Sequence, residues 1–209
     1  LYNCGCSRKE IADSAVVTET GQVYPGTCRN GLPPGRSPRS VRVRVDPVTS
    51  SVRDRLQAPL QQQLASESGD FIVRRADRLF SYQIAVVVDD AEQQISHVVR
   101  GADLLQSTPR QVYLQQLLGL PTPAYLHLPV AVNNKLDKLS KQTFARPVTP
   151  DDRHSAVIDV LRFLRQELPD SPYDASRDEL LQWAIDHWDV TVLPACRTLP
   201  APAEYIERA

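Results

Sequence analysis

A strand that runs into a glycine and then a helix constrains the fold of this chain more than any other segment. The residues from Ile95 to Val99 have the apolar character of a strand, and Gly101 follows two positions later. Apolar side chains then recur at helical spacing, at Val112, Leu114, Leu117 and Leu118. Because a strand, a sharp turn and a helix in succession are typical of α/β proteins, the segment predicts an α/β fold.

A second segment, VRVRV, alternates strictly between valine and arginine. Alternation places every second side chain on the same face of a strand, so Val41, Val43 and Val45 are predicted to share one face. The opposite face is basic, and a basic run leads into it: Arg36, Arg39, Arg42 and Arg44. These arginines suit either an RNA-binding surface or an ordinary solvated strand face, and both interpretations stay open.

Further strands and a basic loop follow. The apolar stretches 71–73 and 79–82 flank Ala76, Asp77 and Arg78 and predict a hairpin. Residues 125–132 predict another strand, and the lysine-rich loop NNKLDKLSKQT comes after it.

The C-terminal part has the pattern of a small helical unit. Pro147 and Pro150 indicate a linker, after which Val157, Leu161 and Leu164 recur at helical spacing. Ser176 with Glu179 three residues later has the form of a capping box at the start of a second helix. The proline-rich tail after Leu193 is expected to be loose.

Composition is that of a globular protein with 209 residues, of which 42% are apolar and 23% charged. The net charge of -1 means that any contact with a polyanion must use local patches. The longest apolar run, Ile84 to Val88, is far too short to cross a membrane. We therefore expect a soluble, cytoplasmic protein with no membrane partner, and we expect a monomer.

Three of the four cysteines are crowded near the start of the chain, at Cys4, Cys6 and Cys28. Thiolates at short spacing suit tetrahedral Zn²⁺, and the Tyr24 phenolate offers a fourth ligand, but free or buried thiols explain the pattern equally well. Ser7 and Glu10 form a second capping box, which predicts a short helix immediately after the first cysteine pair. Neither Cys196 nor the scattered histidines, His97, His127, His154 and His187, are assigned any chemistry.

Taken in order, the segments CGC, YPGTC, GDFIVRRADRLFSYQIAVVVDD, VVRGADLLQSTPRQ, YLHLP and KLSKQ resemble the glutamyl-queuosine tRNA-Asp synthetase family over nearly the whole chain. The resemblance implies the later half of a class I synthetase Rossmann-like catalytic core, with a zinc-binding insertion and a small C-terminal helical unit. It also implies ATP-dependent activation of glutamate, with Mg²⁺, and transfer of the glutamate to queuosine in the anticodon of tRNA-Asp.

The same resemblance assigns roles to individual residues. Structural Zn²⁺ is held by Cys4, Cys6, Tyr24 and Cys28. Tyr82 and Arg100 match the positions that bind glutamate, and arginine suits this role because its guanidinium pairs bidentately with a carboxylate. The ATP-binding loop KLSKQ comprises Lys138, Leu139, Ser140, Lys141 and Gln142. Lys141 is the expected catalytic lysine, because a cation there stabilises charge on the α-phosphate.

Without the resemblance, the same residues have ordinary interpretations. Arg100 suits a surface arginine, Tyr82 suits an aromatic residue at the edge of a core, and KLSK suits a solvated lysine loop.

The chain is expected to divide into three regions. Residues 1–70 form the zinc-binding and acceptor-type insertion, residues 71–146 form the second half of the catalytic core, and residues 147–209 form the helical unit and tail. A class I synthetase also needs an ATP-binding HIGH-type motif and an acidic residue for the amino group of its amino acid. Both are expected before Leu1, so this piece alone is expected to be inactive.

Two alternatives remain open at this point. The first is a chain cut from an ordinary glutamyl-tRNA synthetase, which would continue after KLSK into a large anticodon-binding domain. The second is a catalytically silent, zinc-stabilised tRNA-binding paralogue.

Overall fold

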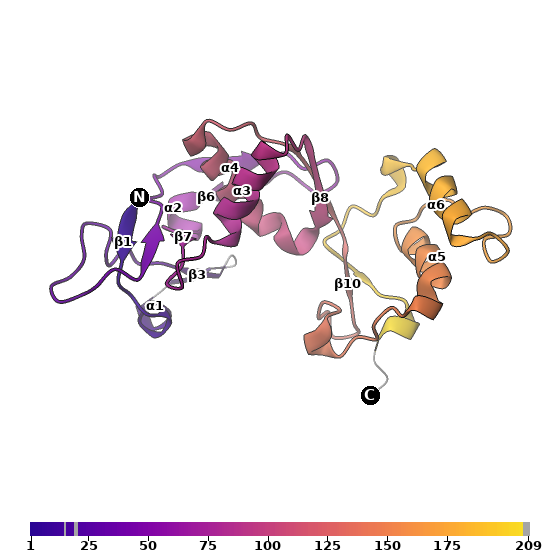
Figure 1. The fold of residues 1–209 in the computed structure, drawn as a ribbon, viewed down its shortest axis with the longest axis horizontal. Coiled ribbons are helices and arrows are strands. Elements are labelled where there is room, and N and C mark those ends of the chain that lie inside the picture. The colour runs from indigo at the N-terminus through magenta and orange to yellow at the C-terminus, as the bar shows by residue number, and fades with distance from the viewer. Residues whose placement is uncertain (15, 19–20, 207–209) are drawn as a thin grey trace. The chain divides into compact units, whose positions relative to one another are not determined.

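The computed structural model describes residues 1–14, 16–18 and 21–206 and divides them into two compact units (Figure 1). The first unit comprises residues 1–54, 59–98 and 104–125, and the second comprises residues 55–58, 99–103 and 126 onwards. The predicted boundaries near residues 70 and 146 do not coincide with this division, and the three functional regions stay a prediction. Among the described residues, no helix is long and apolar enough to cross a membrane.

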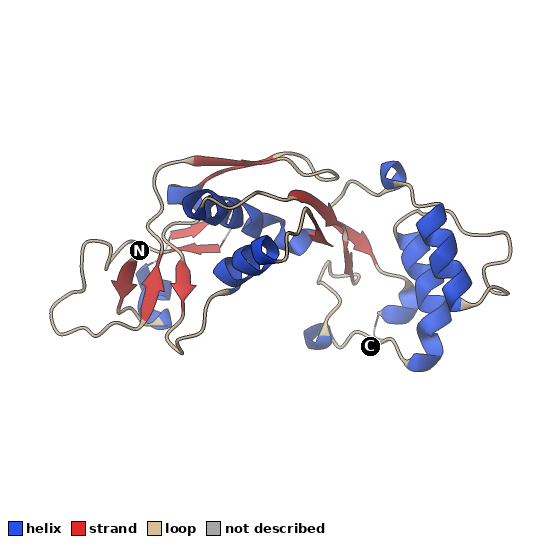
Figure 2. Cartoon of the chain, turned by 45° about the horizontal axis from the view of Figure 1, so that its top comes forward, coloured by secondary structure: helices blue, strands red, loops and turns tan. Residues whose placement is uncertain are grey.

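The first unit contains a three-stranded antiparallel sheet in which β4 (Ser40–Arg42) lies between β1 (Tyr2–Cys4) and β7 (Ile72–Arg74) (Figure 2). Two antiparallel pairs accompany it, β2 (Val16–Thr18) with β3 (Gly21–Val23) and β5 (Thr49–Val52) with β6 (Leu60–Gln63). Two short helices, α1 (Arg8–Ser14) and α2 (Leu64–Glu67), follow β1 and β6. The predicted helix after the cysteine pair is therefore confirmed as α1.

The predicted VRVRV strand is shorter than expected, because β4 ends at Arg42 and its pairing with β7 shifts register between Val41 and Arg42. A register shift breaks the regular alternation of faces. Arg42 and Val43 are consequently both buried, with exposed fractions of 4% and 3%. Val43 and Val45 reach the core as predicted, whereas the prediction that Arg42 shares an exposed face with Arg44 is wrong.

The predicted hairpin is present only as a turn. β7 ends at Arg74, whose antiparallel partner across the turn is the single residue Phe80. Tyr82 begins the helix α3 (Tyr82–Glu92) and does not end a strand. The apolar run from Ile84 to Val88 lies in this helix, although a short continuous apolar run fits a strand and a helix equally well.

The predicted strand, glycine and helix after Ile95 are present in the structure. They correspond to β8 (His97–Gly101), a 3₁₀ segment (Ala102–Ser107) and α4 (Thr108–Leu118). β8 pairs with β9 (Ala124–Leu128), and both strands pass from the first unit into the second. The helix ends at Gly119, whose φ of 66° is readily adopted by glycine.

Helix α4 buries only part of its predicted apolar face. Val112 and Leu114 are buried, but Leu117 and Leu118, in the last turn, are about half exposed. The main core of the first unit combines α4, α3 and the strands, and its buried members are Val43, Val45, Leu64, Phe71, Val73, Val87, Tyr113 and Leu114.

The second unit combines a short parallel strand pair with two helices that pack side by side, α5 (Arg153–Phe163) and α6 (Arg177–Asp186) (Figure 2). The Ser176 hydroxyl accepts a hydrogen bond from the Glu179 amide at 3.3 Å, which confirms the predicted capping box. Ile158 and Leu180 are fully buried, and a further cluster joins Leu126, Leu164 and Leu193.

Over its described residues, up to 206, the proline-rich tail is not loose, contrary to the prediction. Its residues form β11 (Thr198–Pro200), which pairs in parallel with β10 (Val130–Val132). Ala201 is buried, and its amide donates to the Val132 carbonyl at 2.9 Å. The predicted single strand over 125–132 is likewise two strands, because Pro129 lacks the amide hydrogen that continuous pairing needs. Helices and strands thus mix through the chain, in agreement with the predicted α/β class.

Candidate active site and metal-binding cluster

The first unit brings the three N-terminal cysteines together. Cys4 ends β1, Cys6 precedes α1, and Cys28 lies in the turn that follows β3. Gly26 has a φ of 82°, which lets this turn fold back toward β1. The three sulfur atoms lie within 4.8 Å of one another.

Tyr24 adds an oxygen to this group of sulfur atoms. Its hydroxyl oxygen is 3.4 Å from Cys4 Sγ and 3.7 Å from Cys6 Sγ, and Cys6 Sγ is 3.7 Å from Cys28 Sγ. With zinc–sulfur bonds of about 2.3 Å and a zinc–oxygen bond of about 2.0 Å, tetrahedral angles separate two sulfur ligands by about 3.8 Å and a sulfur from an oxygen by about 3.5 Å. These three separations are close to those of a tetrahedral site.

The electrostatics around Cys4 favour a thiolate. Burial raises the pKa of the Cys4 thiol, but interactions with Tyr24 and Arg42 outweigh it and lower the pKa from 9.0 to about 7. Burial, followed by the hydrogen bond with Cys4, raises the pKa of Tyr24. Without a cation, Tyr24 therefore keeps its phenolic proton, and a metal ion would have to displace it.

The loop that carries KLSKQ belongs to the second unit and has a defined shape. The Leu139 amide donates to the Ala131 carbonyl at 3.0 Å. Ser140 and Thr143 form a capping box, in which the Ser140 amide donates to Thr143 Oγ1 at 2.9 Å. Lys141 begins the short 3₁₀ helix that this box caps, and its side chain is exposed.

The same unit brings this loop to the end of β8. Lys138 Nζ donates to Asp103 Oδ2 at 2.5 Å, and Asp103 lies three residues after Arg100. Gly101 lies between them, and a Cβ atom there would lie 2.5 Å from Asp103 Oδ1, so a larger residue would require the Asp103 side chain to move. The structure thus joins the VVRGAD segment to the first lysine of KLSK. The sequence analysis assigned no role to Asp103.

Arg100 has a partner that the sequence analysis also missed. Its Nε–H donates to Nε2 of His127 at 3.0 Å, and His127 is completely buried in β9. Because the arginine can only donate, Nε2 must be the acceptor and the ring proton lies on Nδ1. Gln57 contacts the same residue, because its Nε2 donates a hydrogen bond to the His127 carbonyl at 2.8 Å. The sequence predicts a strand near each of the two residues, but it does not show that these strands pair, as β8 and β9 do.

Tyr82, the other predicted glutamate-binding residue, lies at the first position of α3 with 49% of its surface exposed. It belongs to the first unit and Arg100 to the second. That both side chains face one pocket therefore stays a prediction.

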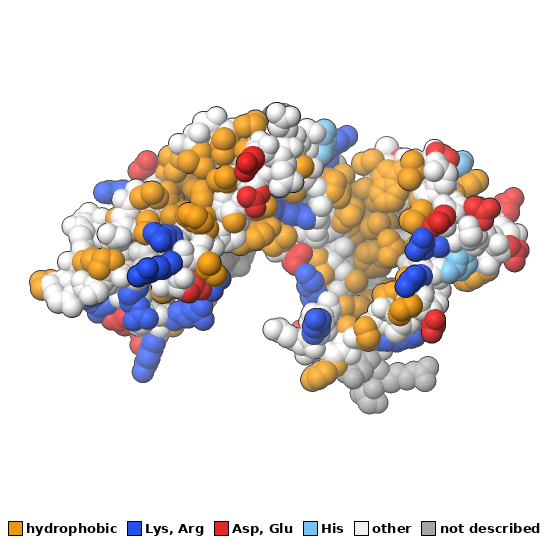
Figure 3. Space-filling model, viewed as in Figure 1, with side chains coloured by type: hydrophobic (Ala, Val, Ile, Leu, Met, Phe, Trp, Pro, Cys, Tyr) orange, Lys and Arg blue, Asp and Glu red, His pale blue; other side chains and the backbone are white. Residues whose placement is uncertain are grey.

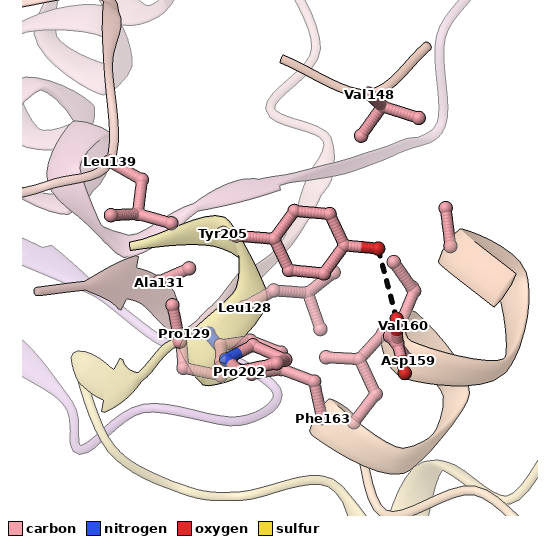
Figure 4. Close-up of a pocket in the computed structure, with 13 residues that line it drawn as sticks. Leu128, Pro129, Ala131, Leu139, Val148, Asp159, Val160, Phe163, Pro202 and Tyr205 are labelled. Atoms are coloured by element: carbon pink, nitrogen blue, oxygen red, sulfur yellow. Dashed lines mark hydrogen bonds between the residues drawn. The ribbon is translucent and has the colours of Figure 1, made fainter. Parts of the chain in front are cut away.

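A separate hollow of about 360 Å³ in the second unit is almost entirely apolar (Figure 4). Its two polar side chains are hydrogen-bonded to each other, since the Tyr205 hydroxyl donates to Asp159 Oδ2 at 2.9 Å. Leu139 of the KLSKQ loop also lines it. Such a lining does not suit glutamate or ATP, and it instead gives Leu139 apolar neighbours.

The chain is similar to known tRNA synthetases. Residues 22–163 match the family model described as tRNA synthetases class I (E and Q), catalytic domain. The crystal structure of a glutamate-tRNA synthetase from Elizabethkingia anophelis has a TM-score of 0.60 at 22% identity, covering 80% of this chain and 37% of that one. At this identity the likeness shows a shared fold alone, a class I synthetase catalytic fold.

Curated relatives are closer in sequence. The chain is 48% identical to the Glutamyl-Q tRNA(Asp) synthetase of Aromatoleum aromaticum, over 100% of this chain and 66% of that protein. It is 49% identical to the Glutamyl-Q tRNA(Asp) synthetase of Dechloromonas aromatica, over 97% of this chain and 68% of that protein. The chain thus spans about two thirds of the length of these relatives.

Proposed function

The chain belongs to the glutamyl-Q tRNA(Asp) synthetase family of class I tRNA synthetases, and from this premise we propose that the whole protein activates glutamate with ATP and transfers it to queuosine in tRNA-Asp. In the first step the glutamate α-carboxylate attacks the α-phosphate of ATP, which forms glutamyl-adenylate and releases pyrophosphate. In the second step a hydroxyl group of the nucleoside attacks the activated carbonyl and releases AMP.

The observation that carries this proposal is the ion pair between Lys138 and Asp103. Through this contact the loop expected to bind ATP lies beside the strand end that bears Arg100, the residue expected to bind glutamate. Carboxylate recognition and phosphate stabilisation must meet at one reacting centre, so this proximity is required by the reaction.

Each residue then has a distinct task. Arg100 and Tyr82 bind the glutamate, and Lys141 stabilises the negative charge that develops on the α-phosphate. Mg²⁺ bound with ATP would share that charge. The other loop residues, Lys138, Leu139, Ser140 and Gln142, position Lys141 beside ATP.

Pyrophosphate exchange by the full-length protein tests the first step. We expect ATP–pyrophosphate exchange that depends on glutamate and is not supported by aspartate or glutamine. Exchange that is absent, or that another amino acid supports equally well, would contradict the proposed substrate.

We further propose that Cys4, Cys6, Tyr24 and Cys28 bind one structural Zn²⁺, which supports the zinc-binding insertion. The spacing of their ligand atoms and the lowered pKa of Cys4 both support this assignment. Metal analysis of the purified protein tests it. About one zinc per chain is expected, and a Cys4–Cys28 disulfide would rule the site out. Monomeric state and cytoplasmic location remain predictions from the sequence.

A further inference from the structure

A hollow of about 360 Å³ on the first unit is lined by four arginines from two separate parts of the chain. Arg39 precedes β4, whereas Arg74, Arg75 and Arg78 come from the end of β7 and the turn after it. All four side chains belong to exposed residues, and no acidic residue is among the described residues that line the hollow. Figure 3 shows basic side chains in blue over this part of the first unit.

The turn holds the backbone at Arg75 and Arg78 in a defined conformation. Arg78 has a φ of 69°, a conformation that favours glycine, yet an arginine occupies it. The backbone is held by hydrogen bonds from the Arg75 amide to the Leu79 carbonyl at 2.8 Å and from the Arg78 amide to the Arg75 carbonyl at 3.0 Å. An unfavourable backbone conformation that is held by its surroundings often marks a functional position.

Charge in this region is only partly balanced. Arg75 pairs with Asp77 at 2.6 Å on the exposed surface, where such a pair contributes little and a phosphate can replace the carboxylate. The other three lining arginines leave an excess of positive charge, although the chain as a whole carries -1. Arginines that line one hollow are well suited to phosphate oxygens.

An exposed aromatic side chain lies beside the arginines. Phe80 pairs with Arg74 across the turn, and 68% of its surface is exposed. A hydrophobic side chain so exposed next to a cluster of cations is unfavourable in water but offers a face for stacking of a nucleobase. Arginines for phosphates together with an aromatic face for a base form the usual combination for binding single-stranded RNA.

We propose that Arg39, Arg74, Arg75, Arg78 and Phe80 form a binding site for unpaired nucleotides of the tRNA substrate. The arginines bind the phosphodiester backbone, and Phe80 stacks on one exposed base. This site rests on the proposed function for the identity of the RNA. It replaces the RNA-binding surface suggested by the VRVRV pattern, of which only Arg39 contributes to it.

The test uses the full-length protein and tRNA-Asp. The triple variant Arg39→Gln, Arg75→Gln, Arg78→Gln should bind tRNA-Asp at least about tenfold more weakly. The slope of log affinity against log salt concentration should become shallower by roughly two to three units, because each lost phosphate contact removes about 0.7 to 0.9 of that slope. Glutamate-dependent pyrophosphate exchange without tRNA should be unchanged. Phe80→Ala should weaken binding severalfold, whereas Phe80→Tyr, which keeps a stacking face, should not.

Arg177→Gln is the matched control, because Arg177 also pairs with a neighbouring aspartate, Asp178, on an exposed surface of the second unit. It should leave tRNA affinity unchanged. If the triple variant has the affinity and salt slope of the wild type, the proposal is wrong. A parallel loss of pyrophosphate exchange would also overturn it, because it would indicate that the arginines have a structural role. If the wild-type protein itself neither activates glutamate nor binds tRNA-Asp, the proposed function fails first and this site fails with it.

Discussion

At the scale of single residues, Arg42 shows how a buried charge can be misjudged from a pattern. Its guanidinium lies 3.7 Å from the centre of the Tyr24 ring, and Nη1 donates to the Asp70 carbonyl at 2.7 Å. A buried cation needs such partners to offset its desolvation. The alternation in VRVRV predicted that Arg42 is exposed, and nothing in this short pattern indicates a register shift or the aromatic neighbour Tyr24.

His127 offers a second residue-scale lesson, since its bond to Arg100 joins positions that are far apart in the sequence. His127→Asn should raise the Michaelis constant for glutamate about tenfold, because the shorter amide cannot reach Arg100 and the guanidinium loses its orientation. His127→Gln should restore it, since its amide oxygen lies near the position of Nε2. Steady-state pyrophosphate exchange measures both, with His97→Ala on the exposed part of β8 as the control. Equal constants for the Asn and Gln variants, or an equal rise in the constant for ATP, would contradict a positioning role.

Lys141 should behave differently from the glutamate-binding residues. Lys141→Ala should lower the rate of glutamyl-adenylate formation about a hundredfold with little change in the Michaelis constant for glutamate, because its charge acts in the transition state. Arg100→Ala should instead mainly raise that constant. Lys135→Ala, an exposed lysine of the same loop, is the matched control. A near-wild-type rate for Lys141→Ala would make KLSK an ordinary lysine loop.

Tyr24 can be tested without any activity assay. Tyr24→Phe removes the one oxygen ligand and leaves the ring beneath Arg42 in place, so we expect zinc to be lost at chelator concentrations that the wild-type protein withstands. Competition with a chromogenic chelator measures this. Tyr173→Phe should behave as wild type. Unchanged zinc retention in Tyr24→Phe would exclude the phenolate as a ligand.

At the scale of elements, the sequence predicted correctly the features that depend on residues close together in the chain. It did not predict the features that depend on pairing between distant strands. Both capping boxes, at Ser7 and Ser176, are present, because each needs only side chains three residues apart. The prediction of a loose tail was wrong because strand pairing depends on distant segments: β10 provides the partner for β11, and no sequence pattern near residue 198 indicates it. The predicted hairpin is reduced to the single antiparallel pair of Arg74 and Phe80, because the segment after it is helical. The KLSK loop is recognisable from its sequence motif, whereas its contact with Asp103 is seen only in the structure.

The cap of α6 gives a stability prediction at this scale. Ser176→Ala removes the hydroxyl that accepts from the Glu179 amide, so unfolding should become easier by about 1 kcal/mol. Urea denaturation of the second unit, followed by the fluorescence of Trp183 and Trp188, measures the change. Ser171→Ala in the preceding loop removes no cap and should be neutral. Equal effects from the two substitutions would show that the cap contributes nothing.

At the scale of the whole molecule, the two units have separate cores and only the first contains the cysteine cluster. Removal of zinc should therefore increase amide hydrogen exchange in β1 and β4 while leaving α5 and α6 protected, because metal binding stabilises only the structure that it joins. Hydrogen–deuterium exchange with and without chelator tests this. Equal loss of protection in both units, or no change in β1 and β4, would contradict a structural zinc site.

The central claim concerns the acceptor, and one measurement tests it most directly. Full-length protein, ATP and radiolabelled glutamate are incubated with tRNA-Asp from cells that make queuosine, with tRNA-Asp from cells that cannot, and with tRNA-Glu. We predict stable transfer of glutamate to queuosine-containing tRNA-Asp alone. Transfer to tRNA-Glu would identify an ordinary glutamyl-tRNA synthetase, and transfer to none of the three, despite an intact zinc site, would contradict the account and favour a catalytically silent paralogue.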